Sequence, residues 1–150
     1  MTMTNKNMSA IESDKLIVFN PKYRDNKNKR ITILRVVIDN EYTRVDFLYW
    51  SLKNNNMGKW IQIEKDTYIR ALNCDKKLKL LKAENIGISP NKSFFKTKLN
   101  LLNFTLYFLP LPKDTVAFDL IEKDTKNENY FNFHKINLKA PIKKYYGSKN

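Results

Sequence analysis

The alternation of apolar and polar side chains is clearest between Leu99 and Glu122, in LNLLNFTLYFLPLPKDTVAFDLIE. From residue 102 the apolar side chains fall on every second position, and Asn103, Thr105 and Tyr107 take the positions between them. The apolar positions are Leu102, Phe104, Leu106 and Phe108. This two-residue period is typical of a strand that buries one face. We therefore expect a core strand here, with Phe104 pointing inward.

Two prolines interrupt this strand. Pro110 and Pro112 have no backbone N–H for the ladder of a central strand, and Lys113–Asp114 is suited to a turn. The two-residue period then resumes from Val116 to Leu120. The whole stretch is expected to form a long hairpin or a crossover between sheets, and to supply much of a β core.

Short strands and turns repeat along the rest of the chain. Further strands are expected at 16–19, 31–38, 44–49, 60–64, 68–72, 78–83 and 130–138, with turns at 39–41, 73–76 and 89–91, a loop at 54–58 and a solvated connector at 22–30. In the last strand Phe131 and Phe133 share one phase, whereas Ile136 and Leu138 share the other. That change of phase predicts a β-bulge near His134–Lys135.

This pattern predicts a single all-β domain, since no window fits an amphipathic helix better than a strand. Many short strands with closely spaced turns favour a sandwich or a barrel, and the strand lengths with proline-marked crossings favour the sandwich. The domain is expected at 16–140. A disordered segment at 1–15 is expected before it and a flexible basic tail at 141–150 after it.

Three stretches resemble a known family when they are taken together: GKWIQIEKDTYI at 58–69, KKLKLLKAENIGISP at 76–90 and FTLYFLPLPKDTVAFDLIEKD at 104–124. In this order they are similar to an uncharacterised immunoglobulin-like β-sandwich domain of bacterial envelope proteins. That domain is often found beside thioredoxin-like or protease modules, where it acts as an accessory domain. The resemblance implies an immunoglobulin-like antiparallel sandwich of about seven to nine strands and an accessory role.

The chain is strongly basic, with a net charge of +13 from 28 Lys and Arg against 15 Asp and Glu. Such a surplus is typical of proteins that bind nucleic acid or an anionic membrane. Here the surplus is nearly all Lys and comes with much Asn and Ile, which also fits the amino-acid bias of A/T-rich coding. Because Arg is the residue that grips phosphates and bases bidentately, its scarcity weakens the nucleic-acid interpretation.

Candidate chemistry is sparse. His134 is the single histidine and Cys74 the single cysteine, so a disulfide within the chain is excluded and a zinc site would lack ligands. The carboxylate pairs Glu64 with Asp66 and Glu122 with Asp124 each lie beside Lys at a strand end, where solvation explains them. We expect no enzyme, no catalytic residue, no metal or other cofactor and no small-molecule substrate.

Two sets of aromatic residues are candidate contacts. Trp50, Trp60 and Tyr107 lie in the phase opposite the core residues of their strands, where they form either an apolar patch for a protein partner or a face covered by other strands. The tail residues Lys143, Lys144, Tyr145 and Tyr146 combine charge with rings, as contacts to a polyanion such as single-stranded nucleic acid do.

The expected function is a non-enzymatic binding or accessory module that acts through contacts with an unknown protein partner. The alternative is a nucleic-acid-binding protein that uses its Lys-rich surface and tail. No apolar run approaches the roughly 20 residues of a membrane span, and no export signal is visible near residue 1. The expected location is cytoplasmic, or the envelope if an export signal has been removed.

Overall fold

The computed structural model describes residues 15–25, 30–50, 60–94, 101–125 and 130–139. Within these ranges the chain forms twelve strands and no helix, so the predicted all-β class is confirmed. The strands are β1 (Leu16–Phe19), β2 (Arg24–Asp25), β3 (Ile31–Ile38), β4 (Thr43–Trp50), β5 (Trp60–Ile63), β6 (Tyr68–Ala71), β7 (Leu78–Glu84), β8 (Gly87–Ile88), β9 (Ser93–Phe94), β10 (Leu101–Phe108), β11 (Ala117–Ile121) and β12 (Asn132–Asn137).

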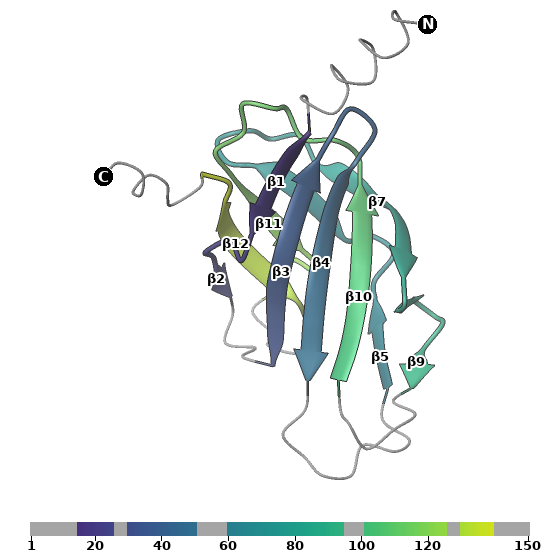
Figure 1. The fold of residues 1–150 in the computed structure, drawn as a ribbon. Coiled ribbons are helices and arrows are strands. Elements are labelled where there is room, and N and C mark those ends of the chain that lie inside the picture. Colours follow the sequence, from purple (N-terminus) through teal and green to yellow (C-terminus); the bar gives the residue numbers. More distant parts are fainter. Residues whose placement is uncertain (1–14, 26–29, 51–59, 95–100, 126–129, 140–150) are drawn as a thin grey trace, which may run out of the picture.

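Nine of these strands form one continuous sheet. Its order is β1-β3-β4-β10-β7-β6-β11-β12-β2, and every neighbouring pair is antiparallel. The sheet curls into a half-barrel, so that β3, β4 and β10 lie in front of β11 and β12 (Figure 1). A separate small sheet has the order β8-β5-β9. The predicted immunoglobulin-like sandwich of two sheets is therefore not confirmed.

The stretch from Leu99 to Glu122 contains a crossover. Strand β10 lies between β4 and β7, whereas β11 lies between β6 and β12, so β7 and β6 separate the two strands. The link between them is anchored where the two prolines flank the buried Leu111, whose backbone N–H donates to Thr43 Oγ1 at 2.9 Å. The stretch is therefore not a hairpin, and the crossover it makes lies within the large sheet and not between two sheets.

Phenyl rings join the two halves of the curled sheet through the core. The ring of Phe104 stacks on that of Phe47 at 4.7 Å, and Phe47 in turn lies 5.8 Å from Phe133 of β12. All three side chains are buried. Aromatic pairs at these distances bury large apolar areas and fix ring geometry as well. The predicted inward phase of Phe104, Leu106 and Phe108 is confirmed.

The predicted bulge in the last strand is also present. Phe133 pairs with Leu120 and Ile136 pairs with Phe118, so His134 and Lys135 together face the single residue Asp119. Lys135 has a φ of 55°, and its backbone N–H donates to Asp119 Oδ1 at 2.9 Å. Because of this extra residue, the apolar side chains on both sides of the bulge face the core.

The two ends of the sheet meet at the connection between β1 and β2. The N–H of Asn20 donates to Leu34 O of β3 at 2.9 Å, and the N–H of Asn137 in β12 donates to Lys22 O at 2.8 Å. The hydroxyl of Tyr23 accepts from the N–H of Ile33 at 3.4 Å, and its ring packs edge-on against Phe133. The prediction of a solvated connector at 22–30 is therefore wrong at its start, since Tyr23 is half-buried and a strand follows it.

The short predicted hairpins are confirmed. Strands β3 and β4 join through a turn in which Asp39 Oδ1 accepts from the N–H groups of Glu41 and Tyr42. Strands β6 and β7 join through a turn that includes Asn73, at a φ of 67°, and the exposed Cys74. All but residue 15 of the expected segment 1–15, the whole expected tail at 141–150 and the expected loop at 54–58 lie outside the described residues.

Replacing Phe104 with alanine tests the core. This side chain is only 2% exposed, so Phe104→Ala is expected to lower the free energy of unfolding by about 3 to 5 kcal/mol. The exposed Leu101 of the same strand provides the control, and Leu101→Ala should cost less than about 0.5 kcal/mol. Urea unfolding measures both. A cost below about 1 kcal/mol for Phe104→Ala would mean that the strand phase is inverted.

Candidate binding site

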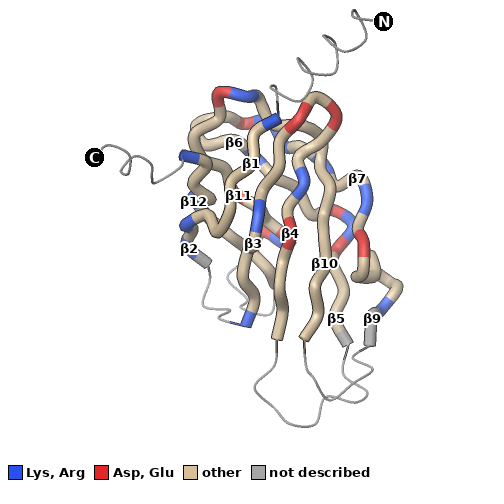
Figure 2. The backbone as a smooth tube through the Cα atoms, viewed as in Figure 1, with Lys and Arg blue, Asp and Glu red and all other residues tan. Residues whose placement is uncertain are grey.

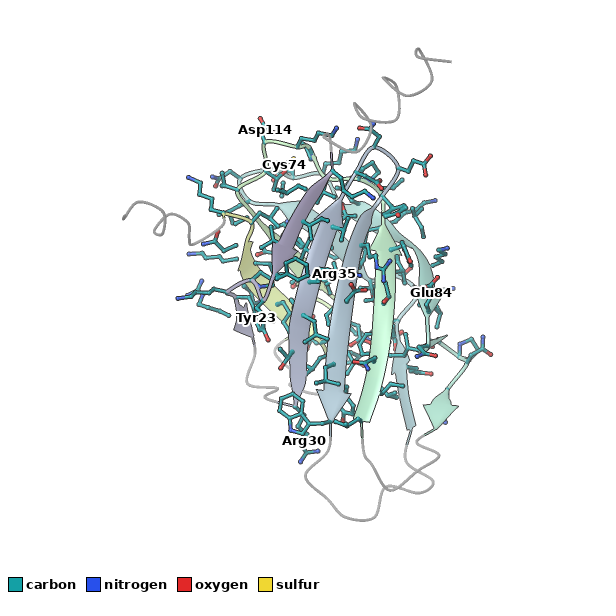
Figure 3. The ribbon with its side chains drawn as sticks, viewed as in Figure 1. Tyr23, Arg30, Arg35, Cys74, Glu84 and Asp114 are labelled. Carbon is teal, nitrogen blue, oxygen red and sulfur yellow. The ribbon has the colours of Figure 1, made fainter. Side chains whose placement is uncertain are left out.

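One row of side chains crosses five strands on the outer face of the sheet. The strand register places Phe19 opposite Arg35, Arg35 opposite Asp46, Asp46 opposite Thr105, and Thr105 opposite Glu84. Directly opposed residues of neighbouring strands share a face and lie within side-chain contact. Residues far apart in the sequence therefore meet on the outer face near Arg35, which Figure 3 shows on the front of the sheet.

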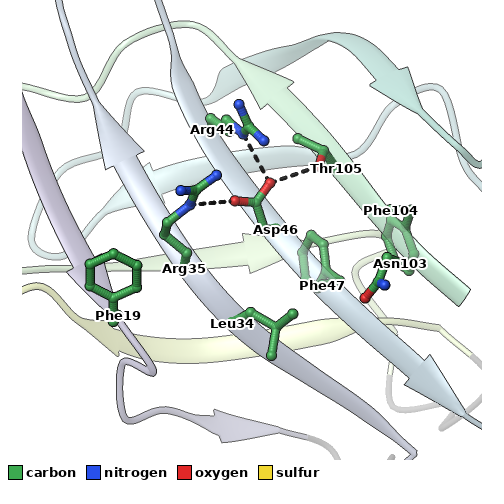
Figure 4. Close-up of a pocket in the computed structure, with 9 residues that line it drawn as sticks. All are labelled: Phe19, Leu34, Arg35, Arg44, Asp46, Phe47, Asn103, Phe104 and Thr105. Atoms are coloured by element: carbon green, nitrogen blue, oxygen red, sulfur yellow. Dashed lines mark hydrogen bonds and ion pairs between the residues drawn. The ribbon is translucent and has the colours of Figure 1, made fainter.

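Asp46 is the centre of this row, because three side chains donate to its carboxylate. Arg35 Nε donates to Oδ2 at 2.7 Å, while Arg44 Nε and Thr105 Oγ1 donate to Oδ1 at 2.9 and 2.7 Å (Figure 4). Asp46 and Thr105 are buried, whereas both arginines are half-buried. Hydrogen bonds between charged groups are stronger than neutral ones. The carboxylate therefore fixes both guanidinium groups in place.

The pKa of Asp46 reflects this arrangement. Burial alone would raise it, but the hydrogen bonds from Thr105, Arg44 and Arg35 together outweigh the burial and hold the pKa below its usual value of 3.8. The carboxylate is therefore ionised at neutral pH. The cluster of two arginines and one aspartate carries one net positive charge.

A second row runs beside the first and covers Tyr107. The guanidinium of Arg44 lies 5.7 Å from the centre of the Tyr107 ring and the ammonium of Lys82 lies 4.6 Å from it, while the hydroxyl donates to Glu84 Oε1 at 3.2 Å. The ring of Tyr42 packs edge-on against it at 5.1 Å. Tyr107 is consequently buried by these neighbouring side chains.

The arginine cluster borders a shallow pocket of about 410 Å³ on the outer face (Figure 4). It is lined by Phe19, Leu34, Arg35, Arg44, Asp46, Phe47, Asn103, Phe104 and Thr105. Phe19 is 65% exposed at one side, and Ile17 is an exposed neighbour on the same strand. The site thus combines fixed cations with exposed apolar surface, a composition that suits binding rather than acid–base chemistry.

The other predicted contact residues are placed as follows. Trp50 is half-buried and pairs with the exposed Leu101, in the same phase of β4 as Asp46, so it shares the outer face with the pocket. Trp60 begins β5, but its side chain lies outside the described residues. The same holds for the tail residues Lys143, Lys144, Tyr145 and Tyr146.

A change of phase in the sequence of β3 indicates the position of Arg35 in the site. In ITILRVVI the buried phase changes between Ile33 and Val36, and the structure shows a register shift at this point that leaves Leu34 as an extra residue. This shift places Arg35 opposite Asp46 on the outer face. The same kind of phase change correctly predicted the bulge at His134–Lys135.

Glu122 corrects the expectation that the carboxylates at strand ends are solvated. Its side chain is buried, and its two oxygens accept from the N–H groups of Phe131 at 2.7 Å and Glu64 at 3.0 Å. Burial raises the pKa of Glu122 from 4.5 to about 7, although the two backbone donors oppose this shift. The carboxyl group therefore connects the segment after β5 with the segment before β12.

His134 lies at the bulge of β12, and Cys74 lies in the turn between β6 and β7. His134 Nδ1 lies 4.0 Å from Asp119 Oδ1 at the bulge, and Cys74, labelled in Figure 3, is exposed. Over the described ranges, no three His, Cys, Asp or Glu side chains gather where a metal could bind. In the same ranges no helix has the length and apolar character needed to cross a membrane.

The chain was compared with protein families, curated proteins and solved structures, and none of these comparisons returned a match.

Glu122 makes stability depend on pH. Because its folded pKa is raised, the folded state binds the proton more tightly than the unfolded chain, so stability should fall as pH rises from about 4.5 to about 7. The fall should reach about 3 kcal/mol, since one pKa unit corresponds to about 1.4 kcal/mol. Urea unfolding of Glu122→Gln should show a flatter profile over this range. The variant Glu84→Gln, at an exposed position, serves as control and should keep the wild-type profile. Equal slopes of the free energy of unfolding against pH for wild type and Glu122→Gln would contradict the assignment.

Proposed function

We propose that this protein is a non-enzymatic binding module that contacts a protein partner through the outer face of β1, β3, β4 and β10. The observation that carries the proposal is the exposed Phe19 ring opposite Arg35, together with Arg44 from the next row. The carboxylate of Asp46 holds both arginines. Aromatic residues and arginine are the side chains that contribute most to protein interfaces.

The apolar residues of this face support the proposal. Phe19 and Ile17 lie on β1, which is an end strand of the large sheet, and Leu101 lies exposed beside Trp50 at another part of the same face. An end strand with exposed apolar side chains can pair with or pack against a second chain. The resemblance to an envelope accessory domain supports the same class of function. If the resemblance holds, the curled sheet is a variant of the immunoglobulin-like sandwich.

Nucleic-acid binding is the second candidate, favoured by the charge of +13 and by the exposed Lys76, Lys77, Lys79 and Lys82. Figure 2 shows basic positions near β7 but also at β2, β12 and the turns, so positive charge is spread over several parts of the molecule. A spread of this kind supports weak binding that depends on salt and not on sequence.

Removing the Phe19 ring tests the proposal. Tagged wild-type protein, Phe19→Ser and the control Val116→Ser are used to capture partners from an extract of the native host at about 50 mM and about 500 mM salt. Val116 is a suitable control because it is 49% exposed, and it precedes β11, outside the Phe19 row. We expect a protein that persists at high salt and is recovered at least about tenfold less with Phe19→Ser only.

Two results would contradict the protein-contact proposal. One is recovery of the same proteins in equal amounts with Phe19→Ser and with wild type. The other is recovery of nucleic acid alone, lost at high salt in all three samples, which would promote the second candidate.

A further inference from the structure

The arginine pair defines what the partner must present. We infer that the Arg35–Arg44 pocket binds the side-chain carboxylate of an Asp or Glu in the partner, with an apolar side chain of the same partner segment on Phe19 and Leu34. This inference rests on the proposed function, because it specifies the partner chemistry for the same face.

The donors of the two guanidinium groups are largely unused. Each group has five N–H donors, and each commits its Nε to Asp46. To the residues that the structure describes, neither group makes a further hydrogen bond; Arg44 adds its contact with the Tyr107 ring and an electrostatic attraction to Glu84. Since the Arg35 and Arg44 side chains are 34% and 31% exposed, the remaining donors are accessible to a ligand.

Asp46 holds the two arginines ready for an anionic ligand, and it does not occupy the space that the ligand would take. It is buried beneath the arginines, and both of its oxygens already accept hydrogen bonds. Holding Nε in this way restricts each side chain before binding, which lowers the entropy lost when an anion binds. The single net charge of the cluster complements a monoanionic carboxylate better than a dianionic phosphate.

The surroundings of the cations favour a side-chain carboxylate attached to an apolar segment. Proteins that capture a chain-terminal carboxylate use convergent backbone N–H groups. Here the donors come from side chains on paired strands, whose backbone groups belong to the sheet ladder. Phe19 and Leu34 border the cations and provide apolar surface beside them. In an extended peptide, residues two apart project to the same side. An acidic residue and an apolar residue at that spacing therefore reach the arginine donors and the Phe19–Leu34 surface together.

The test uses the blocked peptide Ac-Glu-Ala-Phe-NH2, its counterpart Ac-Gln-Ala-Phe-NH2 and inorganic phosphate. Binding is followed through the ¹⁵N-correlated Nε–H signals of Arg35 and Arg44. We expect the Glu peptide to shift both signals and to bind about tenfold more tightly than the Gln peptide, as charge-assisted bonds predict. Equal effects of the two peptides, or stronger binding of phosphate than of the Glu peptide, would overturn the inference.

Two variants and a matched control complete the experiment. Arg35→Gln should weaken the Glu peptide about tenfold, and Arg35→Lys should weaken it as well because the planar fork is lost while the charge remains. Arg70 is the control, since it is also 34% exposed and pairs with an aspartate, Asp119, in the other half of the sheet. Arg70→Gln should leave binding unchanged, and the Arg44 signal in each variant reports that the fold is intact.

The two proposals fail in different ways. Full Glu-peptide binding by both Arg35 variants, with partner capture still dependent on Phe19, would refute the carboxylate site and leave the protein-contact function standing. Loss of the Phe19 dependence in partner capture would refute the function itself.

Discussion

The ion cluster of the buried Asp46 with Arg35, Arg44 and Thr105 is the constraint on which the outer face depends. A carboxylate removed from water is costly unless charged donors satisfy its oxygens. Here two guanidinium groups and one hydroxyl satisfy it from three neighbouring strands. Removing one donor therefore leaves a buried charge with less compensation. The cluster ties β3, β4 and β10 together on the side opposite the core, and it leaves N–H donors of both arginines on the outer face.

The curl of the sheet complements this cluster from the inner side. Phe47 and Phe104 pack toward β12, so the strands that carry the arginines outside carry the central rings inside. The connection between β1 and β2 brings both ends of the sheet together through Asn20 and Lys22. Register shifts adjust each face: one places Arg35 opposite Asp46, and the other returns Ile136 to the core after Phe133. The binding face and the core are thus two sides of the same strands.

The sequence predicts the strands well, because a two-residue period follows directly from burial of one face, as at Phe104 and Phe118. It does not predict whether the strands form one sheet or two. That difference depends on the outer partners of the β6–β7 hairpin. Strand β7 pairs with β10 and β6 pairs with β11, and no local pattern determines pairings between strands so far apart in the sequence. The sequence does not predict the Asp46 site for a similar reason, because only the pairing register of the strands places Arg35 and Thr105 opposite Asp46. The burial of Glu122 depends on backbone donors at positions 64 and 131, which the sequence cannot place.

The pKa of Asp46 tests the account of the outer face most directly, since it reports whether the arginines and Thr105 donate to this carboxylate in solution. It can be measured from the ¹³C chemical shift of the Asp46 carboxyl group during a titration with acid. The account predicts a pKa below the usual 3.8, and a higher value in Arg35→Gln. A wild-type pKa at or above 3.8 would mean that burial outweighs the donors, and the arrangement proposed to present the two arginines would then be contradicted.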